Sequence, residues 1–167
     1  MIQYLQASTP EHIQQARELF LEYQRWLGVD LCFQGFEREL AELPGEYAPP
    51  GGRLLLVKVD DKVAGCVALH RLGEGLCEMK RLYLRPEFQG HGLGRQMVEK
   101  LIDVARSLGY HRMRLDTIAA KMQSAVHLYR NLGFREIQAY RPNPEPSALY
   151  MELNLDQPPS DSVNSQR

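Results

Sequence analysis

The chain opens on an alternation of apolar and polar residues that gives way to a helical period. Residues 2–7, IQYLQA, alternate as a half-buried strand does. Thr9, Pro10 and Glu11 then read as an N-cap, a first-turn proline and a first-turn acid. Apolar residues follow at alternating steps of three and four, at Ile13, Ala16, Phe20, Tyr23 and Leu27. We predict a strand and then a helix that ends at Gly28.

The next part of the chain predicts strands joined by short turns. Residues 33–43 carry a weaker helical pattern, after which prolines and glycines interrupt regular structure as far as Gly52. Two apolar runs, residues 53–59 and 63–69, flank the turn-forming pair Asp60–Asp61 and predict a hairpin. A second turn, over residues 72–75, leads into the apolar run of residues 77–84, CEMKRLYL.

The second half of the chain predicts helices and strands in alternation. A helix that ends at Gly109 is indicated by an apolar stripe at Leu93, Met97, Leu101, Ala105 and Leu108. Strands are predicted over residues 112–117, 134–139 and 149–155, with a helix over residues 122–132. We expect one domain over residues 1–155 and a disordered tail over residues 156–167, which lack an apolar face.

Composition restricts the partners that we expect. The formal net charge of -1 argues against nucleic-acid binding by electrostatics. No run approaches the ~18 apolar residues of a membrane helix, and the first residues do not resemble a secretion signal. Cys32, Cys66 and Cys77 stand singly in apolar surroundings, without the paired spacing of a zinc site or a disulfide framework, and we expect Cys66 and Cys77 to be small core residues rather than nucleophiles. We therefore expect a cytoplasmic protein with no metal, no nucleic-acid partner and no membrane partner.

The segment from Arg85 to Arg95, RPEFQGHGLGR, carries the strongest chemical signal. Three glycines, Gly90, Gly92 and Gly94, stand between an apolar strand and an amphipathic helix. Glycines remove side chains where a ligand must touch backbone, and the first N–H groups of a helix are free to bind an anion. The segment therefore predicts an anion cradle.

This segment resembles the cofactor loop of the GCN5-related N-acetyltransferases (the GNAT family), whose signature is Gln or Arg, two residues, Gly, one residue, then Gly or Ala. Gln89, Gly92 and Gly94 match it. In that family the loop amides hold the pyrophosphate of coenzyme A, and the strand before it contacts the pantetheine arm. The resemblance implies that the cofactor, acetyl-CoA, is bound by Leu82, Tyr83, Leu84, Gln89, Gly90, Gly92, Leu93 and Gly94. The side chains of His91 and Arg95 beside the loop could also pair with the phosphates, or form only a solvated basic rim; the place of Arg95 in the first helical turn favours the phosphate role.

A second match to the same family lies downstream, in the segment QSAVHLYRNLGFR from Gln123 to Arg135. Tyr129 falls on the position that usually protonates the departing thiolate in that family; the alternative is that Tyr129 only fills the core. The family often has an asparagine seven residues before this tyrosine, where this chain has Met122. That cofactor contact is therefore not carried over, although Gln123 or Ser124 could cap the helix or replace it.

The acceptor side of the site is less clearly marked. Glu78 lies eleven residues before Gln89, the offset at which histone-acetylating relatives carry a catalytic glutamate. The sequence leaves three roles open for Glu78: a general base, an anchor for the substrate ammonium, or a surface charge. Many small-molecule members of the family use a chain of water molecules as the base instead. Asp116 and His127 are weaker candidates for the same cleft. Arg141, in the proline-rich segment YRPNPEP (residues 140–146), is a candidate partner for a substrate carboxylate.

Taken together, the two matches imply an α/β (α+β) fold with a mixed, mostly antiparallel sheet of about seven strands. The sheet is expected to be twisted, splayed after the residue 78–84 strand and covered by helices on both faces. The implied activity is direct acetyl transfer, in a ternary complex, to a small-molecule amine or amino acid, and homodimers are common in the family. Two alternatives stay open: a non-catalytic acyl-CoA sensor or partner protein, and an NAD(P)-binding oxidoreductase, since a strand, a Gly-x-Gly turn, a helix and Asp116 also resemble a dinucleotide-binding unit.

Overall fold

A computed structural model describes residues 1–28 and 35–156 of the chain. Its sheet has seven strands in the order β1-β2-β3-β4-β5-β7-β6, and all neighbours are antiparallel except β4 and β5. The strands are β1 (Ile2–Gln6), β2 (Arg53–Val59), β3 (Lys62–Gly73), β4 (Leu76–Leu84), β5 (Arg112–Ile118), β6 (Arg135–Ile137) and β7 (Ala148–Asn154). The helices are α1 (Pro10–Leu27), α2 (Phe36–Glu42), α3 (Leu93–Ser107) and α4 (Gln123–Asn131). The predicted fold class is confirmed.

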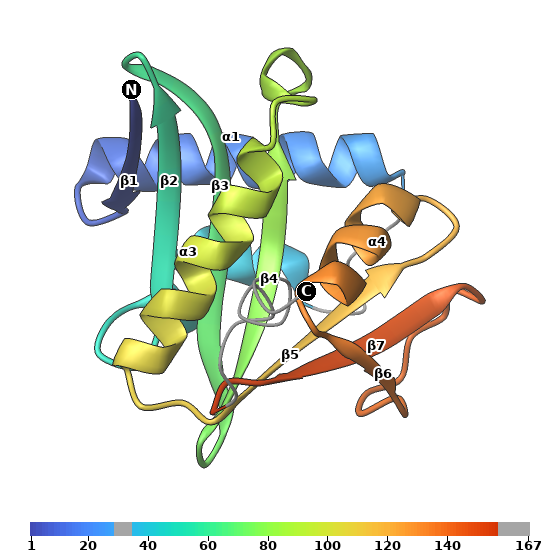
Figure 1. Ribbon diagram of the computed structural model, residues 1–167. Coiled ribbons are helices and arrows are strands. Elements are labelled where there is room, and N and C mark those ends of the chain that lie inside the picture. The colour runs from blue at the N-terminus through green and yellow to red at the C-terminus, as the bar shows by residue number, and fades with distance from the viewer. Residues whose placement is uncertain (29–34, 157–167) are drawn as a thin grey trace, which may run out of the picture.

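Helices cover both faces of the sheet (Figure 1): α1 and α2 one face, α3 and α4 the other. The ends of α1 follow from its caps. The Thr9 side chain accepts a hydrogen bond from the His12 amide at 3.1 Å, and Gly28 ends the helix in the left-handed conformation at φ 69°. Both ends lie where the sequence predicts them.

Two predicted strands differ in extent, and parts of three expectations fall outside the described residues. The strand predicted over residues 134–139 is shorter, at Arg135–Ile137, and the one predicted over residues 63–69 runs on to Gly73 because it pairs with β4 up to the turn. The start of the helix predicted over residues 33–43, Cys32 and the tail beyond Asp156 lie outside the described residues. Cys66 and Cys77 are fully buried, as predicted for core residues.

The sheet opens between β4 and β5. These two parallel strands pair only from Leu76 to Glu78 against Arg112 to Arg114, after which they separate while β5 continues against β7. The separation is visible in Figure 1 as the wedge between β4 and β5. The predicted splaying is therefore confirmed. The glycine segment does open a parallel β4–α3–β5 crossover, but the short pairing and the antiparallel neighbours differ from the doubly wound sheet of a dinucleotide-binding domain.

A β-bulge in β4 changes the face of the sheet to which the following side chains point. Cys66 pairs with Tyr83 but Ala68 pairs with Lys80, so β4 has one more residue than β3 across this step. Arg81 adopts φ 59° at the bulge, and its buried guanidinium binds Glu39 at 2.9 and 3.0 Å. As a result Met79 and Leu82 both face the side of α3, whereas Tyr83 packs on the side of α1.

Candidate active site

The glycine segment forms an open loop at the start of α3. Gly90 and Gly92 have φ of 86° and 77°, in the region that glycine favours, and Gly92 is the N-cap of α3. A Cβ atom built on Gly90, Gly92 or Gly94 would meet no atom of the chain within 4 Å. The missing side chains therefore leave free space above the helix N-terminus, where N–H groups and the helix dipole favour an anion.

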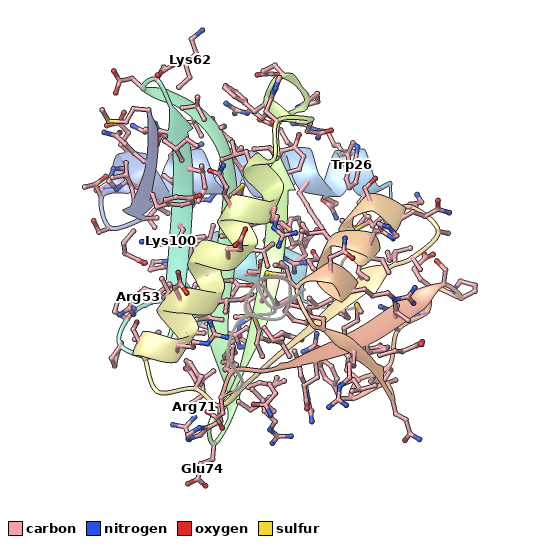
Figure 2. All side chains as sticks on the ribbon, viewed as in Figure 1. Trp26, Arg53, Lys62, Arg71, Glu74 and Lys100 are labelled. Atoms are coloured by element: carbon pink, nitrogen blue, oxygen red, sulfur yellow. The ribbon has the colours of Figure 1, made fainter. Side chains whose placement is uncertain are left out.

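A groove of about 660 Å³ runs from this loop between β4 and α4. Seven of the predicted cofactor residues line it: Leu82, Tyr83, Leu84, Gln89, Gly90, Gly94 and Ser124. Trp26, which is half exposed near the end of α1, also lines the groove (Figure 2). Lys121 fixes that end of α1 by donating a hydrogen bond from Nζ to the Leu27 carbonyl at 2.6 Å.

The other predicted cofactor residues lie beside the groove rather than along its wall. The side chain of Leu93 is buried in the core, so only its backbone can face a ligand. His91 is exposed at the loop. Arg95 lies in the first turn of α3 and pairs with Glu99 at 3.1 Å on the helix surface. Gln89, which does line the groove, donates a hydrogen bond from its side-chain amide to the Leu84 carbonyl at 2.8 Å and so connects the loop to the end of β4.

Tyr129 lies inside the wedge between β4 and β5. Its side chain is 3% exposed, and it packs on Phe134 with ring centroids 5.6 Å apart. Burial raises the pKa of Tyr129 above its ordinary value, so the phenol stays protonated. Tyr129 lines an inner cavity of about 40 Å³ together with Leu82, Leu115, Thr117 and Met122.

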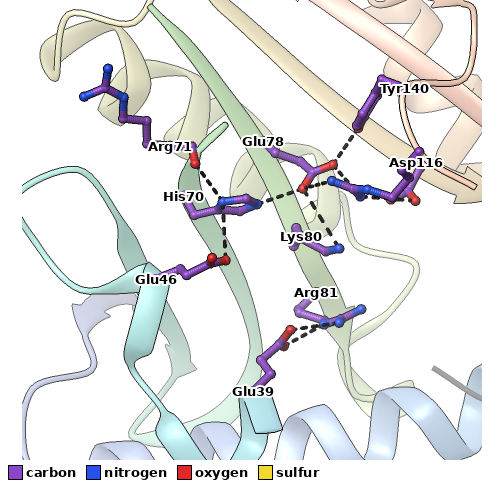
Figure 3. A network of polar contacts seen from close by, with 10 residues as sticks. Glu39, Glu46, His70, Arg71, Glu78, Lys80, Arg81, Asp116 and Tyr140 are labelled. Atoms are coloured by element: carbon purple, nitrogen blue, oxygen red, sulfur yellow. Dashed lines mark hydrogen bonds and ion pairs between the residues drawn. The ribbon is translucent and has the colours of Figure 1, made fainter. Parts of the chain in front are cut away.

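Glu78 is fully buried and accepts hydrogen bonds from three residues in two segments, β3 and the segment before β7 (Figure 3). His70 Nε2 on β3 lies 2.7 Å from Oε1, the Tyr140 hydroxyl donates to Oε2 at 2.6 Å, and Arg141 binds both oxygens at 2.8 and 2.7 Å. Burial by itself would raise the pKa of Glu78, but the bonds from His70 and Arg141 outweigh it and hold the pKa well below its usual range. Glu78 is therefore not a surface charge.

Charged neighbours surround this carboxylate in a polar pocket of about 430 Å³. Lys80 Nζ lies 4.0 Å from Glu78 Oε1, and burial, with a contribution from nearby Arg81, lowers the pKa of the lysine. Arg141 Nη1 lies 3.5 Å from Asp116 Oδ2, so the structure brings the two candidate substrate residues together. His127 is exposed on α4 and lines none of these hollows.

The groove, the inner cavity and the polar pocket follow one another through the wedge. Leu82 and Met122 belong to both the groove and the inner cavity, and Lys80 belongs to both the inner cavity and the polar pocket. Tyr129 lines the inner cavity, which has lining residues in common with both the groove and the polar pocket. Such an arrangement suits a transfer between two bound molecules.

Sequence reasoning missed His70, Lys80, Tyr140 and Trp26. A partial signal existed for the first two. The turn predicted at residues 72–75 brings His70 close to Glu78, although their direct pairing depends on the register shift between Arg71 and Gly73, and Lys80 follows Glu78 by two residues on the same strand face. Tyr140 and Trp26 come from segments that are distant in sequence from Glu78 and the glycine loop, and no local sequence pattern indicates that they belong to the site. Within residues 1–28 and 35–156, no group of three or more His, Cys, Asp or Glu side chains is placed to hold a metal ion, and no helix is long and apolar enough to cross a membrane.

Comparison with known proteins gives a consistent result. Residues 13–134 match the acetyltransferase (GNAT) family. The chain is 40% identical over 148 residues to an uncharacterised N-acetyltransferase of Schizosaccharomyces pombe. The alignment covers 87% of this chain and 90% of that protein.

Solved structures show the same fold. A GNAT-family acetyltransferase of Staphylococcus aureus superposes with a TM-score of 0.76 at 21% identity. The superposition covers 93% of this chain and 100% of the Staphylococcus aureus chain. A Salmonella typhimurium protein described as a putative acetyltransferase with its cofactor acetyl-CoA superposes with a TM-score of 0.64 at 20% identity, covering 94% and 95% of the two chains.

Proposed function

Because the chain belongs to the acetyltransferase (GNAT) family, we propose that it transfers an acetyl group from acetyl-CoA to the amine of a small molecule or amino acid. The transfer takes place directly, in a ternary complex of protein, donor and acceptor. The observation that carries the proposal is a set of three neighbouring hollows with lining residues in common, which we assign as a donor side, a meeting point and an acceptor side.

The donor side is the groove between β4 and α4. The open space above Gly90, Gly92 and Gly94 fits a diphosphate, since a Cβ at any of these positions would project into space that the chain leaves empty. The amides at the start of α3 and the positive end of its dipole bind the negative charge. Leu82, Tyr83 and Leu84 present the edge of β4 that β5 leaves unpaired, and their backbone is available to the amides of the pantetheine arm.

The acceptor side is the polar pocket. A carboxylate with so low a pKa is a weak base, because a general base works best with a pKa near the working pH. Of the two roles that burial leaves to Glu78, general base and ammonium anchor, we favour the anchor. Arg141 and Lys80 stand beside it and provide positive charge for a carboxylate, so an amino acid suits the pocket.

Tyr129 is the proposed general acid. The reaction breaks the bond between the acyl carbon and sulfur, and the departing thiolate needs a proton. A buried phenol with a raised pKa holds its proton until that negative charge develops close to it. The amine must arrive without its extra proton, which water or a neighbouring side chain removes.

The test is release of free thiol from acetyl-CoA with a panel of amines and amino acids, on wild type and Tyr129→Phe. We expect the variant to lose about a hundredfold to ten-thousandfold in kcat, while binding of coenzyme A is unchanged. Tyr4→Phe, on β1 and away from the three hollows, is the matched control and keeps the wild-type rate.

A loss of only a fewfold in Tyr129→Phe would make Tyr129 a packing residue. Binding of acetyl-CoA without thiol release across the whole panel would instead favour a non-catalytic acyl-CoA sensor.

A further inference from the structure

Lys80 stands between the hollow assigned to the acceptor and the hollow that contains Tyr129. Among the described residues, it alone lines both the polar pocket and the inner cavity. We propose that Lys80 is the general base: its neutral amine takes a proton from the acceptor's ammonium before that nitrogen attacks the thioester. The inference rests on the proposed function, because it assumes an amine acceptor in the polar pocket.

The position of the lysine amine suits this role. Lys80 follows Glu78 by two residues on β4, so both side chains point to the same face of the strand, and Nζ lies 4.0 Å from Glu78 Oε1 (Figure 3). An acceptor ammonium anchored beside Glu78 is therefore within reach of the lysine Nζ. Two cations beside one carboxylate repel each other, and this repulsion favours the loss of a proton from one of them.

Burial prepares the lysine to accept a proton. Its side chain is 10% exposed, and burial, followed by the positive charge of Arg81, lowers the pKa of Lys80. Glu78 and Asp116 act to raise this pKa, and Arg141 acts to lower it. The other titratable groups that line the two hollows are Tyr23, Glu39, Glu46, Tyr47, His70 and Tyr129. A lowered pKa brings the neutral amine toward the working pH, where a general base is most effective.

The other titratable groups of the acceptor pocket are less suited to take up a proton. The ring of His70 points both nitrogens at oxygens that only accept, Nε2 at Glu78 and Nδ1 at the carbonyl of the following residue at 3.0 Å, so neither nitrogen offers a lone pair. Glu39 binds a buried guanidinium, and Glu46 is 81% exposed and solvated. Burial raises the pKa of Tyr47 well above its ordinary value.

The proton transfers balance. Lys80 Nζ takes one proton from the acceptor ammonium and becomes positively charged, and the lone pair of the acceptor nitrogen then forms the new C–N bond. The C–S bond breaks and Tyr129 protonates the departing thiolate. The tyrosine is reprotonated by the proton that the attacking nitrogen loses on becoming an amide, and Lys80 returns its own proton to the solvent. Arg141 provides positive charge for an acceptor carboxylate throughout, and Lys80 adds its charge once it holds the proton.

Thiol release by Lys80→Arg and Lys80→Met, measured against acceptor concentration and pH with the best acceptor of the panel, tests this role. Arginine keeps the positive charge but does not give up its proton, whereas methionine removes the charge. We expect both variants to lose about a hundredfold or more in kcat at neutral pH. The loss shrinks as the pH rises through the acceptor's own pKa, because the amine then arrives already deprotonated.

The matched controls are Lys100→Arg and Lys100→Met, on α3 and away from the three hollows, which keep the wild-type rate. Calorimetric titration of coenzyme A checks that the donor side of each variant is intact. A lysine that only supplies positive charge gives a different result: Lys80→Arg keeps the wild-type kcat, and Lys80→Met raises the KM of the acceptor. That result overturns the inference, while thiol release by wild type keeps the proposed function intact.

NMR titration of the lysine side chains in wild type decides the matter should neither Lys80 variant fold. We expect the Lys80 signal to titrate below the ordinary lysine value of about 10.4, and titration at that value overturns the inference. Failure of wild type to release thiol with any acceptor overturns the proposed function and this inference with it.

Discussion

Glu78 joins parts of the chain that are distant in sequence. His70 is eight residues away, but Tyr140 and Arg141 come from the segment before β7, 62 and 63 residues downstream. A carboxylate that is fully buried needs all of these partners, because an unpaired buried charge is costly. Glu78 therefore fixes the proline-rich segment in place, and this segment lines the polar pocket that we assign to the acceptor.

Glu78→Gln is expected to destabilise the fold in a pH-dependent way. At neutral pH the variant leaves Arg141 and His70 facing a neutral amide, which costs about 3 kcal/mol in the free energy of unfolding. The pKa of Glu78 is lowered in the folded state, so its contribution is fully present above the unfolded pKa of about 4.3 and fades as the pH falls below that value. Urea unfolding at neutral pH and near pH 3 measures the difference.

The matched control for this prediction is Glu99→Gln, which removes a surface pair with Arg95 and changes stability by less than about 1 kcal/mol. A gap between wild type and Glu78→Gln that is the same at both pH values would contradict the account of the buried carboxylate.

At the scale of elements, the bulge in β4 decides which side chains reach the groove. The extra residue at Arg81 puts Leu82 on the side of α3, next to the inner cavity. The backbones of β3 and β4 approach closely just beyond it. A Cβ at Gly65 would overlap the Tyr83 carbonyl oxygen, so the approach requires glycine there.

Gly65→Ala therefore disrupts the pairing of β3 with β4. We expect a loss of about 3 kcal/mol in the free energy of unfolding and weaker binding of coenzyme A, because Tyr83 and Leu84 line the groove. Gly73→Ala, in the same strand, meets the Leu76 side chain only at ordinary contact distance and changes stability by less than about 1 kcal/mol. Chemical denaturation of both variants checks this, and equal stabilities would refute the close approach.

The sequence predicts those features that local residues encode. Thr9 and Gly28 set the ends of α1, and the glycine loop stands out because its spacing is unusual for a plain turn. The bulge could not be predicted, since arginine gives no sign of a positive φ and its stabilising partner, Glu39, is 42 residues away. The contacts of Tyr140 and Arg141 with Glu78 could not be predicted for the same reason, because they depend on how distant segments pack.

At the scale of the molecule, the splayed sheet is what makes room for chemistry. Strands β4 and β5 begin as paired neighbours and then separate, and the inner cavity between them has lining residues in common with the groove beside α4 and with the polar pocket beside Glu78. The helices on the two faces support the edges of this opening (Figure 1). On this account, donor and acceptor enter by different routes and meet in the middle of the molecule.

Calorimetric titration of coenzyme A into wild type and Gly94→Ala tests the central claim, that bare backbone in the glycine loop binds the diphosphate. Gly94 lies in the first turn of α3 with no atom near its absent side chain, so alanine stabilises the helix by about 0.5–1 kcal/mol. The same methyl group enters the space assigned to the ligand, and we predict at least a tenfold loss of affinity, about 1.4 kcal/mol, in a protein no less stable than wild type. Absence of heat with wild type, or equal affinity in the variant, would contradict the account.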